Sequence, residues 1–416
     1  MILTCLNSGE PMKSGFHILT IIAVSVLLLS GCATYQANVG PTPINRAQEE
    51  IAEDQLMDVG IQAFESEEIS AKEAEDEGTS NEIRKAEGHF FAYHLKNTLQ
   101  QSSHWGAVRV IPAEIDSIDV FVKGKIIESN GEHLTVQIEV VDAAGRQWFT
   151  KKYKMAASKG SYQGNRPGEK DAYQDLYNSI ANDMADYKRK LTAGDIKKIR
   201  TIAKLKFAED FAPDAFGGYL AKGKKDEVEI KRLPADDDPM MARLLKIRER
   251  EYTYIDTLNE QYDVFYNDMW PSYENWRRLN MTERQAIREI KRKAFTRQLV
   301  GALLIAGAIA AGSTNSSSAA AVQTGVVVVG AQVIISGFNV SKEAEIHEEA
   351  IRELSESFSS EMEPVVMEFE GRQYELTGSA EEQFTQWRAL LRKIYFMETG
   401  FDPEPAGDAV GSDPPD

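Results

Sequence analysis

The segment His133-Leu-Thr-Val-Gln-Ile-Glu-Val-Val141 alternates apolar and polar side chains along its length. Successive side chains of a strand point to opposite faces, so this alternation predicts a strand with one face in a hydrophobic core. The residues expected to face the core are Leu134, Val136, Ile138 and Val140. Asn130-Gly131 lies just before the segment and is a strong signal for a tight hairpin turn. Val120–Glu128 is therefore predicted as the preceding, antiparallel strand.

The segments on either side extend this pattern into a domain. Further strands are predicted at Gln55–Phe64, Trp105–Ile111 and Trp148–Met155, and amphipathic helices at Asn81–Gln101 and Glu169–Leu191. An antiparallel meander sheet with flanking helices is a normal α+β arrangement for a region of this length. Residues 55–191 are therefore predicted to form an α+β domain.

The first 32 residues carry a secretion signal. Lys13 precedes an apolar run from Phe16 to Leu29, which is too short to span a bilayer. The sequence Leu29-Ser30-Gly31-Cys32 follows, and it resembles the lipobox of bacterial lipoproteins. That resemblance implies that residues 1–31 are removed and that Cys32 is acylated, which anchors the chain to a membrane without a spanning helix. The alternative is an ordinary signal or anchor helix that ends near a cysteine by chance.

Two further expectations concern the amino-terminal region. Met12 lies directly before Lys13, so translation starts at either Met1 or Met12. Ala33 and Thr34 follow the cysteine and lack the aspartate that resembles an inner-membrane retention signal in enterobacteria. The expected location is thus the periplasmic face of an outer membrane.

Composition limits the classes of partner. The chain has 416 residues, a net charge of −18 and two cysteines, Cys5 and Cys32. A protein this acidic repels nucleic acid, which is therefore not an expected partner. Because Cys5 precedes the cleavage site and Cys32 carries lipid, the mature protein is expected to have no disulfide.

Several segments resemble proteins of bacterial envelopes. The pattern of elements over residues 55–190 is similar to small periplasmic domains, such as the N-terminal domain of the Tol–Pal propeller protein and the periplasmic part of the curli-secretion lipoprotein. Three segments resemble uncharacterised proteobacterial outer-membrane lipoproteins, namely Leu56–Phe64, His104–Pro112 and Leu376–Arg388. These resemblances imply an envelope location and no particular activity.

The remainder of the chain divides by composition. Residues 32–54 are expected to be an acidic tether, residues 192–400 a mainly helical domain, and residues 401–416 a disordered tail. Asp236-Asp237-Asp238-Pro239 predicts the start of a long helix, by capping rather than by binding a cation. That helix is expected to be interrupted or kinked at Pro271 and to resume through Arg297.

Residues 298–341 contain no charged side chain in a protein that is 27% charged. Gly312–Ser318 has the composition of a turn, so two helical arms of a hairpin are predicted, Leu299–Ala311 and Ala319–Phe338. Small residues let helices approach closely. The candidate interaction residues are Ala302, Ala306, Gly307, Ala310, Gly325 and Gly330. Basic residues dominate 277–297 and acidic residues dominate 343–363, which favours pairing of the two arms.

Three roles for this hairpin remain open. It packs inside its own helical bundle, it associates with copies of itself or with an envelope protein, or it enters a bilayer. A full crossing is disfavoured, because thirteen helical residues extend about 20 Å and the apolar core of a bilayer is about 30 Å thick.

No motif for catalysis, cofactors or metals is found. Five histidines follow the signal: His89, His94, His104, His133 and His347. His347 begins His-Glu-Glu-Ala-Ile and lacks the second histidine of a zinc motif. The leading hypothesis is a non-enzymatic lipoprotein that acts as a structural or protein-interaction module. The alternatives are an accessory subunit of a trans-envelope export assembly that oligomerises through 298–341, or an enzyme with an unrecognised site.

Overall fold

The computed structural model describes residues 41–113, 115, 117–162, 171–223, 227–310, 346–347, 349–353, 355–356, 364–369 and 372–400. From Pro43 onward these residues belong to one compact unit. The predicted signal peptide and the predicted tail lie outside the described residues.

A mixed β-sheet lies at the centre of the unit. Its strands are β1 (Val59–Gln62), β2 (Glu65–Ser66), β3 (Val108–Ile111), β4 (Val120–Ser129), β5 (His133–Asp142) and β6 (Gln147–Ala156). Their spatial order is β3-β1-β4-β5-β6, and β2 pairs with β4. Strands β4, β5 and β6 are antiparallel neighbours, whereas β1 is parallel to both β3 and β4.

The predicted combination of sheet and helices is confirmed as a mixed α and β fold, but the prediction of an antiparallel sheet is wrong at β1. The helix α3 (Asn81–Ser102) lies between β1 and β3 in the chain. A helical crossover returns the chain in its original direction, so the strand that follows pairs in parallel. The four-residue length of β1 and β3 left too little pattern to predict this pairing.

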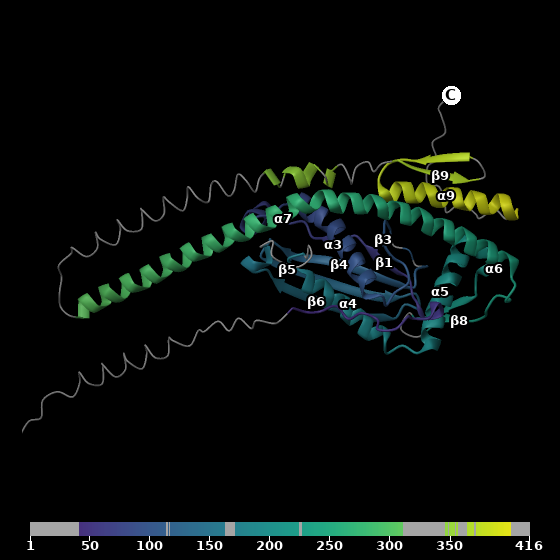
Figure 1. The fold of residues 1–416 in the computed structure, drawn as a ribbon, viewed down its shortest axis with the longest axis horizontal. Coiled ribbons are helices and arrows are strands. Elements are labelled where there is room, and N and C mark those ends of the chain that lie inside the picture. The colour runs from purple at the N-terminus through teal and green to yellow at the C-terminus, as the bar shows by residue number, and fades with distance from the viewer. Residues whose placement is uncertain are drawn as a thin grey trace, which may run out of the picture. The chain divides into compact units, whose positions relative to one another are not determined.

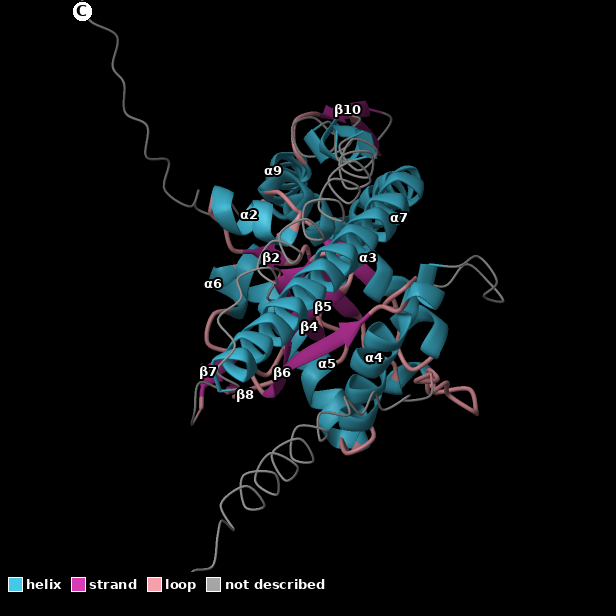
Figure 2. Cartoon of the chain, turned by 90° about the vertical axis from the view of Figure 1, so that its left-hand side faces the viewer, coloured by secondary structure: helices cyan, strands magenta, loops and turns pink. Residues whose placement is uncertain are grey.

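One face of the sheet is covered by helices. The side chains of β5 predicted to face the core are all buried, while Gln137 and Glu139 between them are partly exposed. Helix α3 packs on β1, β3 and β4, and helix α4 (Gln174–Lys188) lies beside β6 (Figure 2). Asp183 of α4 accepts hydrogen bonds from Tyr153 and Lys151 of β6, each of 2.6 Å.

The remaining elements are short, apart from three helices. The short ones are η2 (Glu53–Gln55), α2 (Ala71–Glu77), η3 (Lys159–Tyr162), α6 (Pro213–Phe216), β7 (Leu220–Lys222), β8 (Val228–Ile230), β9 (Val365–Phe369) and β10 (Arg372–Leu376). Besides α3 and α4, the long helices are α5 (Ala193–Phe211), α7 (Pro239–Ala310) and α9 (Ala380–Thr399). Strands β9 and β10 form an antiparallel pair next to α9 in the chain.

Helix α7 begins where the sequence predicts. Asp238 Oδ1 accepts hydrogen bonds from the backbone N–H groups of Met240 and Met241, and Pro239 is the first helical residue. The interpretation of the aspartate triplet as a helix cap is thus confirmed. Of the two outcomes predicted at Pro271, the interruption is wrong, because α7 continues through it to Ala310, and Figure 1 shows that this continuous helix is bent along its length. Pro271 and Asn267, whose carbonyl loses its helical partner, are both exposed, so water can satisfy that carbonyl.

Helix α7 packs against α3, α5, α9 and β3. Its aromatic residues contribute to a hydrophobic core that also contains residues of the sheet, so the two regions predicted as separate domains share one core. Asn259 covers the edge of the sheet, since its Oδ1 accepts from Val110 N (2.9 Å) and its Nδ2 donates to Val110 O (2.8 Å). The side chain therefore takes the place of a neighbouring strand at β3.

Candidate functional site

Helix α7 meets α3, β4 and the start of α4 at a group of largely buried polar side chains, which we call the polar cluster. Sheet, crossover helix and long helix all contribute to it. Its members are Glu87, His94, Ser129, Asp171, Gln174, Tyr266, Tyr273 and Arg277.

Glu87 joins three elements. The side chain is fully buried, and its Oε1 accepts hydrogen bonds of 2.5 Å from both Ser129 Oγ of β4 and Tyr273 OH of α7. Burial raises the pKa of Glu87, and the two donors together with the cations Arg84 and Arg277 offset only part of that increase. A carboxyl held in this way fixes the position of α7 over α3 and β4.

Arg277 forms a salt bridge with Asp171, and both side chains are almost completely buried. Arg277 Nη2 donates to Asp171 Oδ2 over 2.7 Å. Burial alone raises the pKa of Asp171, but Arg277 and His94 outweigh it, so the pKa of this carboxyl lies below its ordinary value. The guanidinium carbon also lies 4.3 Å from the centre of the Tyr273 ring and 5.5 Å from that of Tyr173, within the range of cation–π attraction.

The hydrogen bonds of His94 define its tautomer. Gln174 Nε2 donates to Thr98 Oγ1 and to Asn178 Oδ1, so Gln174 Oε1 is an acceptor. Therefore His94 Nε2 donates to Gln174 Oε1 (2.9 Å), and His94 Nδ1 accepts from Tyr266 OH (2.7 Å). Burial lowers the pKa of His94, which keeps the ring neutral in this arrangement.

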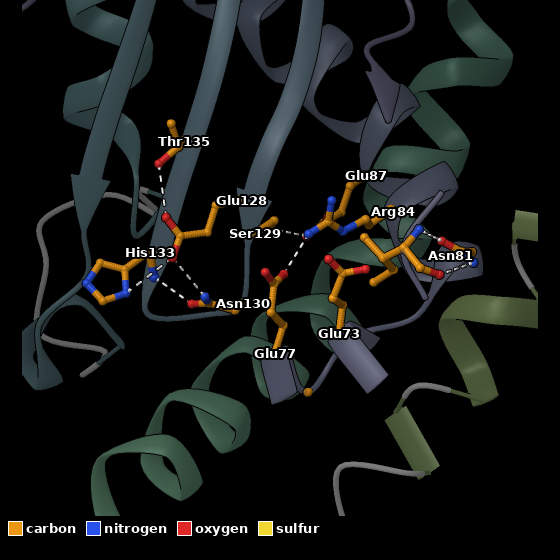
Figure 3. A network of polar contacts seen from close by, with 12 residues as sticks. Glu73, Glu77, Asn81, Arg84, Glu87, Glu128, Ser129, Asn130, His133 and Thr135 are labelled. Carbon is orange, nitrogen blue, oxygen red and sulfur yellow. Dashed lines mark hydrogen bonds and ion pairs between the residues drawn. The ribbon is translucent and has the colours of Figure 1, made fainter. Parts of the chain in front are cut away.

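Figure 3 shows the part of this network nearest the turn between β4 and β5. Arg84 Nη2 donates to Glu77 Oε2 (2.6 Å), which ties α3 to the end of α2. In the turn itself, Asn130 Oδ1 accepts from His133 N over 2.8 Å. Ser129, which donates to the buried Glu87, lies directly before this turn in the chain.

The Asn130-Gly131 turn is also a docking point for α7. Gly131 has a φ of +74°, and a Cβ atom placed on it would lie 2.3 Å from the backbone oxygen of Arg277. Asn280 Nδ2 donates to Asn130 O over 3.0 Å. The predicted hairpin turn is thus confirmed, and its glycine is required both by the backbone conformation and by the approach of α7.

No residue of the polar cluster lines either of two cavities found among the described residues. These cavities, of about 540 and 740 Å³, are lined by other residues. In the smaller one, Arg388 donates to Asp210 Oδ2 (2.5 Å) and to Glu251 Oε2 (2.8 Å), so its charge holds α9 to α5 and α7. The polar cluster therefore joins buried charged and polar groups of different elements, which fixes α7 to the sheet, while Glu87 Oε2 and the Nε and Nη1 atoms of Arg277 have no hydrogen-bond partner in the described part of the chain.

The candidate interaction residues fall into two groups. Cys32, Gly325 and Gly330 lie outside the described residues. Ala302, Ala306, Gly307 and Ala310 fall within the helical backbone of α7. Positions four residues apart share one face of an α-helix, so the spacing of the three alanines meets the condition from which an interaction face was predicted.

Two of the basic residues assigned to the charged arm of the predicted hairpin have other partners. Arg277 pairs with Asp171, and both terminal nitrogens of Arg288 donate to the carboxylate of Glu132. Arg352 of the acidic arm pairs with Glu349 of its own segment. The prediction that the basic arm pairs with the acidic arm is therefore wrong for Arg277 and Arg288, which pair with Asp171 and Glu132 of the body of the protein.

Sequence reasoning did not identify the polar cluster, although a signal for it exists. Ile83, Glu87, Phe90 and His94 are spaced three or four residues apart on α3, and all are buried. A glutamate on the apolar stripe of an amphipathic helix needs a buried partner. That stripe could have indicated that Glu87 has a buried polar partner. It could not have identified the partner as Tyr273, which lies on a helix nearly 190 residues away in the chain.

No known family model matches the chain, and no curated protein matches it. Among the described residues, no group of three or more His, Cys, Asp and Glu side chains is arranged to hold a metal ion. No helix within the described ranges is both long enough and apolar enough for a membrane crossing.

Proposed function

We propose that the chain is a lipid-anchored envelope protein that acts as a structural or protein-interaction module. Acylation of Cys32 holds it at the periplasmic face of an outer membrane, and it needs no cofactor and catalyses no reaction. The short apolar run and the lipobox-like Leu29-Ser30-Gly31-Cys32 support this location.

The observation that carries the interaction role is the division of α7 into two parts. Up to Met281 its inner face is buried in the shared core and held by the polar cluster. Of the side chains described between Thr282 and Lys293, none is buried. The 29 residues from Thr282 to Ala310 extend about 44 Å at 1.5 Å per residue. A helix that is packed in the core up to Met281 and has no buried side chain among those described from Thr282 to Lys293 is suited to present the segment that follows.

That segment is the charge-free stretch of residues 298–341. Contiguous apolar surface is unfavourable in water, so the stretch needs a covering partner. We assign it a helical hairpin whose small residues meet a second copy of the chain or an envelope protein. The alternative function, an accessory subunit of a trans-envelope export assembly, uses the same segment to form an oligomer.

The test is a comparison of two arginine substitutions on α7. Gly307→Arg puts a charge in the apolar segment, whereas Thr282→Arg changes an exposed position on the same helix. Light scattering and co-purification of the detergent-solubilised mature protein should show loss of a partner or of the oligomer in Gly307→Arg only, with unchanged circular dichroism. A wild-type monomer excludes the export assembly. Identical behaviour of all three proteins, or unfolding of Gly307→Arg alone, contradicts the interaction role.

A further inference from the structure

Helix α5 and the turn before it carry a concentration of positive charge in an acidic protein. Residues 188–206 contain eight basic side chains and one acidic side chain, Asp195, whereas the whole chain has a net charge of −18. The basic residues are Lys188, Arg189, Lys190, Lys197, Lys198, Arg200, Lys204 and Lys206. This segment is therefore strongly basic, whereas the protein as a whole is strongly acidic.

Three of these cations form one surface, which we call the basic face: Lys197, Arg200 and Lys204. Their spacing of three and four residues places them on one side of α5, and they line the cavity of about 740 Å³. Among the described residues, none of the three forms a salt bridge within 4.0 Å. Burial lowers the pKa of Lys204, and Arg200 adds to that decrease. Glu53 and Asp54 line the same cavity, and Glu53 and Asp119 raise the pKa of Lys204 in part, but neither Glu53 nor Asp54 pairs with the three cations within 4.0 Å. Three cations thus face two carboxylates in this cavity, and the basic face keeps a net positive charge.

The tether runs past this face. Asn45 N donates to Asn182 Oδ1 (2.7 Å) and Asn182 Nδ2 donates to Pro43 O (2.9 Å), which fixes the tether on α4. Further along, Arg200 Nη1 donates to the backbone oxygen of Glu53 over 2.6 Å. The chain between residues 32 and 43 can extend no more than about 40 Å in any conformation. A lipid on Cys32 thus keeps this end of the folded unit within that distance of the bilayer.

We propose that the basic face lies against anionic phospholipid headgroups in the leaflet that holds the anchor. The inference rests on the proposed lipid anchor. Each Lys or Arg near an anionic surface strengthens association by about fivefold (about 1 kcal/mol). The rest of the chain is acidic and is repelled by the same surface, so attraction and repulsion together select one orientation. The part of α7 that follows Met281 is then presented in a defined direction from the membrane.

The experiment uses the mature lipidated protein in two kinds of vesicle, one of phosphatidylcholine alone and one with about a third phosphatidylglycerol. An amine-reactive reagent followed by mass spectrometry measures the labelling of each lysine. Lys197 and Lys204 should be labelled about fivefold more slowly in anionic vesicles, and about 1 M salt should remove the difference. Lys72 and Lys85 serve as internal controls, because they are exposed near the opposite end of α3 from Ser102, where Ala47 of the tether binds.

Matched variants separate the basic face from general charge effects. Arg200→Glu removes one cation but keeps both reporter lysines, and it should abolish their protection, whereas Lys85→Glu should retain it. Flotation with neutral vesicles depends only on the anchor, so its failure contradicts the proposed function. Equal labelling of wild-type Lys197 and Lys204 in both vesicle types, with flotation intact, overturns the basic-face proposal alone.

Discussion

Arg277 of α7 and Asp171, three residues before α4, form a salt bridge of 2.7 Å whose side chains are 1% and 0% exposed. Removing both charges from water costs free energy that offsets much of their attraction, so such a pair adds little net stability. Its main effect is to determine which elements pack together. Here it defines where α7 crosses the layer of α3 and α4. The part of α7 in which no described side chain is buried, Thr282 to Lys293, starts only five residues further on, so the salt bridge also sets the position of the segment that we propose binds a partner.

Breaking this salt bridge on one side should be strongly destabilising. In Arg277→Met, Asp171 is left as a buried charge without its cation, and the free energy of unfolding should fall by about 3–5 kcal/mol. Adding Asp171→Asn removes that charge, so the double variant should be more stable than the single one. Urea unfolding followed by circular dichroism measures both.

An exposed pair provides the control for that series. Arg189 and Asp186 form a salt bridge at the surface, so Arg189→Met should cost less than about 1 kcal/mol. A double variant at Arg277 and Asp171 that is less stable than Arg277→Met would show that the charges are not coupled as the structure indicates.

The docking of α7 on the β4–β5 turn can be tested with two glycines of similar conformation. Gly131 (φ +74°) has the backbone oxygen of Arg277 against its missing Cβ, whereas Gly218 (φ +84°) has no atom within 4 Å. Both alanine variants lose about 1 kcal/mol from the left-handed backbone. Only Gly131→Ala must also displace α7, so it should be less stable than Gly218→Ala by about 2 kcal/mol or more. Equal thermal unfolding of the two variants contradicts the docking.

Asn259 covers the edge of β3, and its removal should expose that edge. Asn259→Ala leaves the backbone N–H and C=O of Val110 without these partners, which should cost about 2–3 kcal/mol and increase aggregation on heating. Asn275→Ala is the matched control, because Asn275 donates to Pro271 O and accepts from Arg278 Nη2, both in its own helix, and is not part of a sheet edge. The comparison needs unfolding curves and light scattering at several temperatures.

The elements that were predictable from sequence are those with a complete local pattern. The alternation in β5, the Asn130-Gly131 turn and the Asp238 cap each depend on residues close together in the chain, and the structure confirms them. The parallel pairing of β1 and the partners of Arg277 depend on segments far apart, and no local rule specifies such contacts. The interruption predicted at Pro271 was wrong, because the effect of a proline inside a helix depends on whether water can reach the carbonyl that loses its N–H partner.

The dependence of stability on pH should contain a contribution from His89. Its ring lies 5.8 Å from that of Tyr262 and 6.2 Å from that of Phe265, and burial lowers its pKa to about 4. The unfolded chain therefore binds a proton at higher pH than the folded chain, so this contribution is present above about pH 6.5 and is lost as the pH falls toward 4. Because the ring is partly exposed, we expect a loss of about 2 kcal/mol rather than the full value of the shift.

Measurement of unfolding between pH 7 and 4 tests this contribution, for which we expect a smaller acid-induced loss in His89→Phe than in the wild type. His133→Gln is the control, since His133 lies at the surface near Glu128 and Glu132. An identical pH profile for His89→Phe and the wild type would rule out the proposed role of this ring.

The mass of the amino-terminal peptide, from protein purified out of bacterial membranes, shows whether the mature chain begins at Cys32 and carries lipid there. The lipoprotein account predicts that this peptide begins at residue 32 and carries a diacylglycerol group on the cysteine together with an acylated amino terminus. A peptide that still includes the apolar run before residue 32, or one that begins there with an unmodified thiol, contradicts the account.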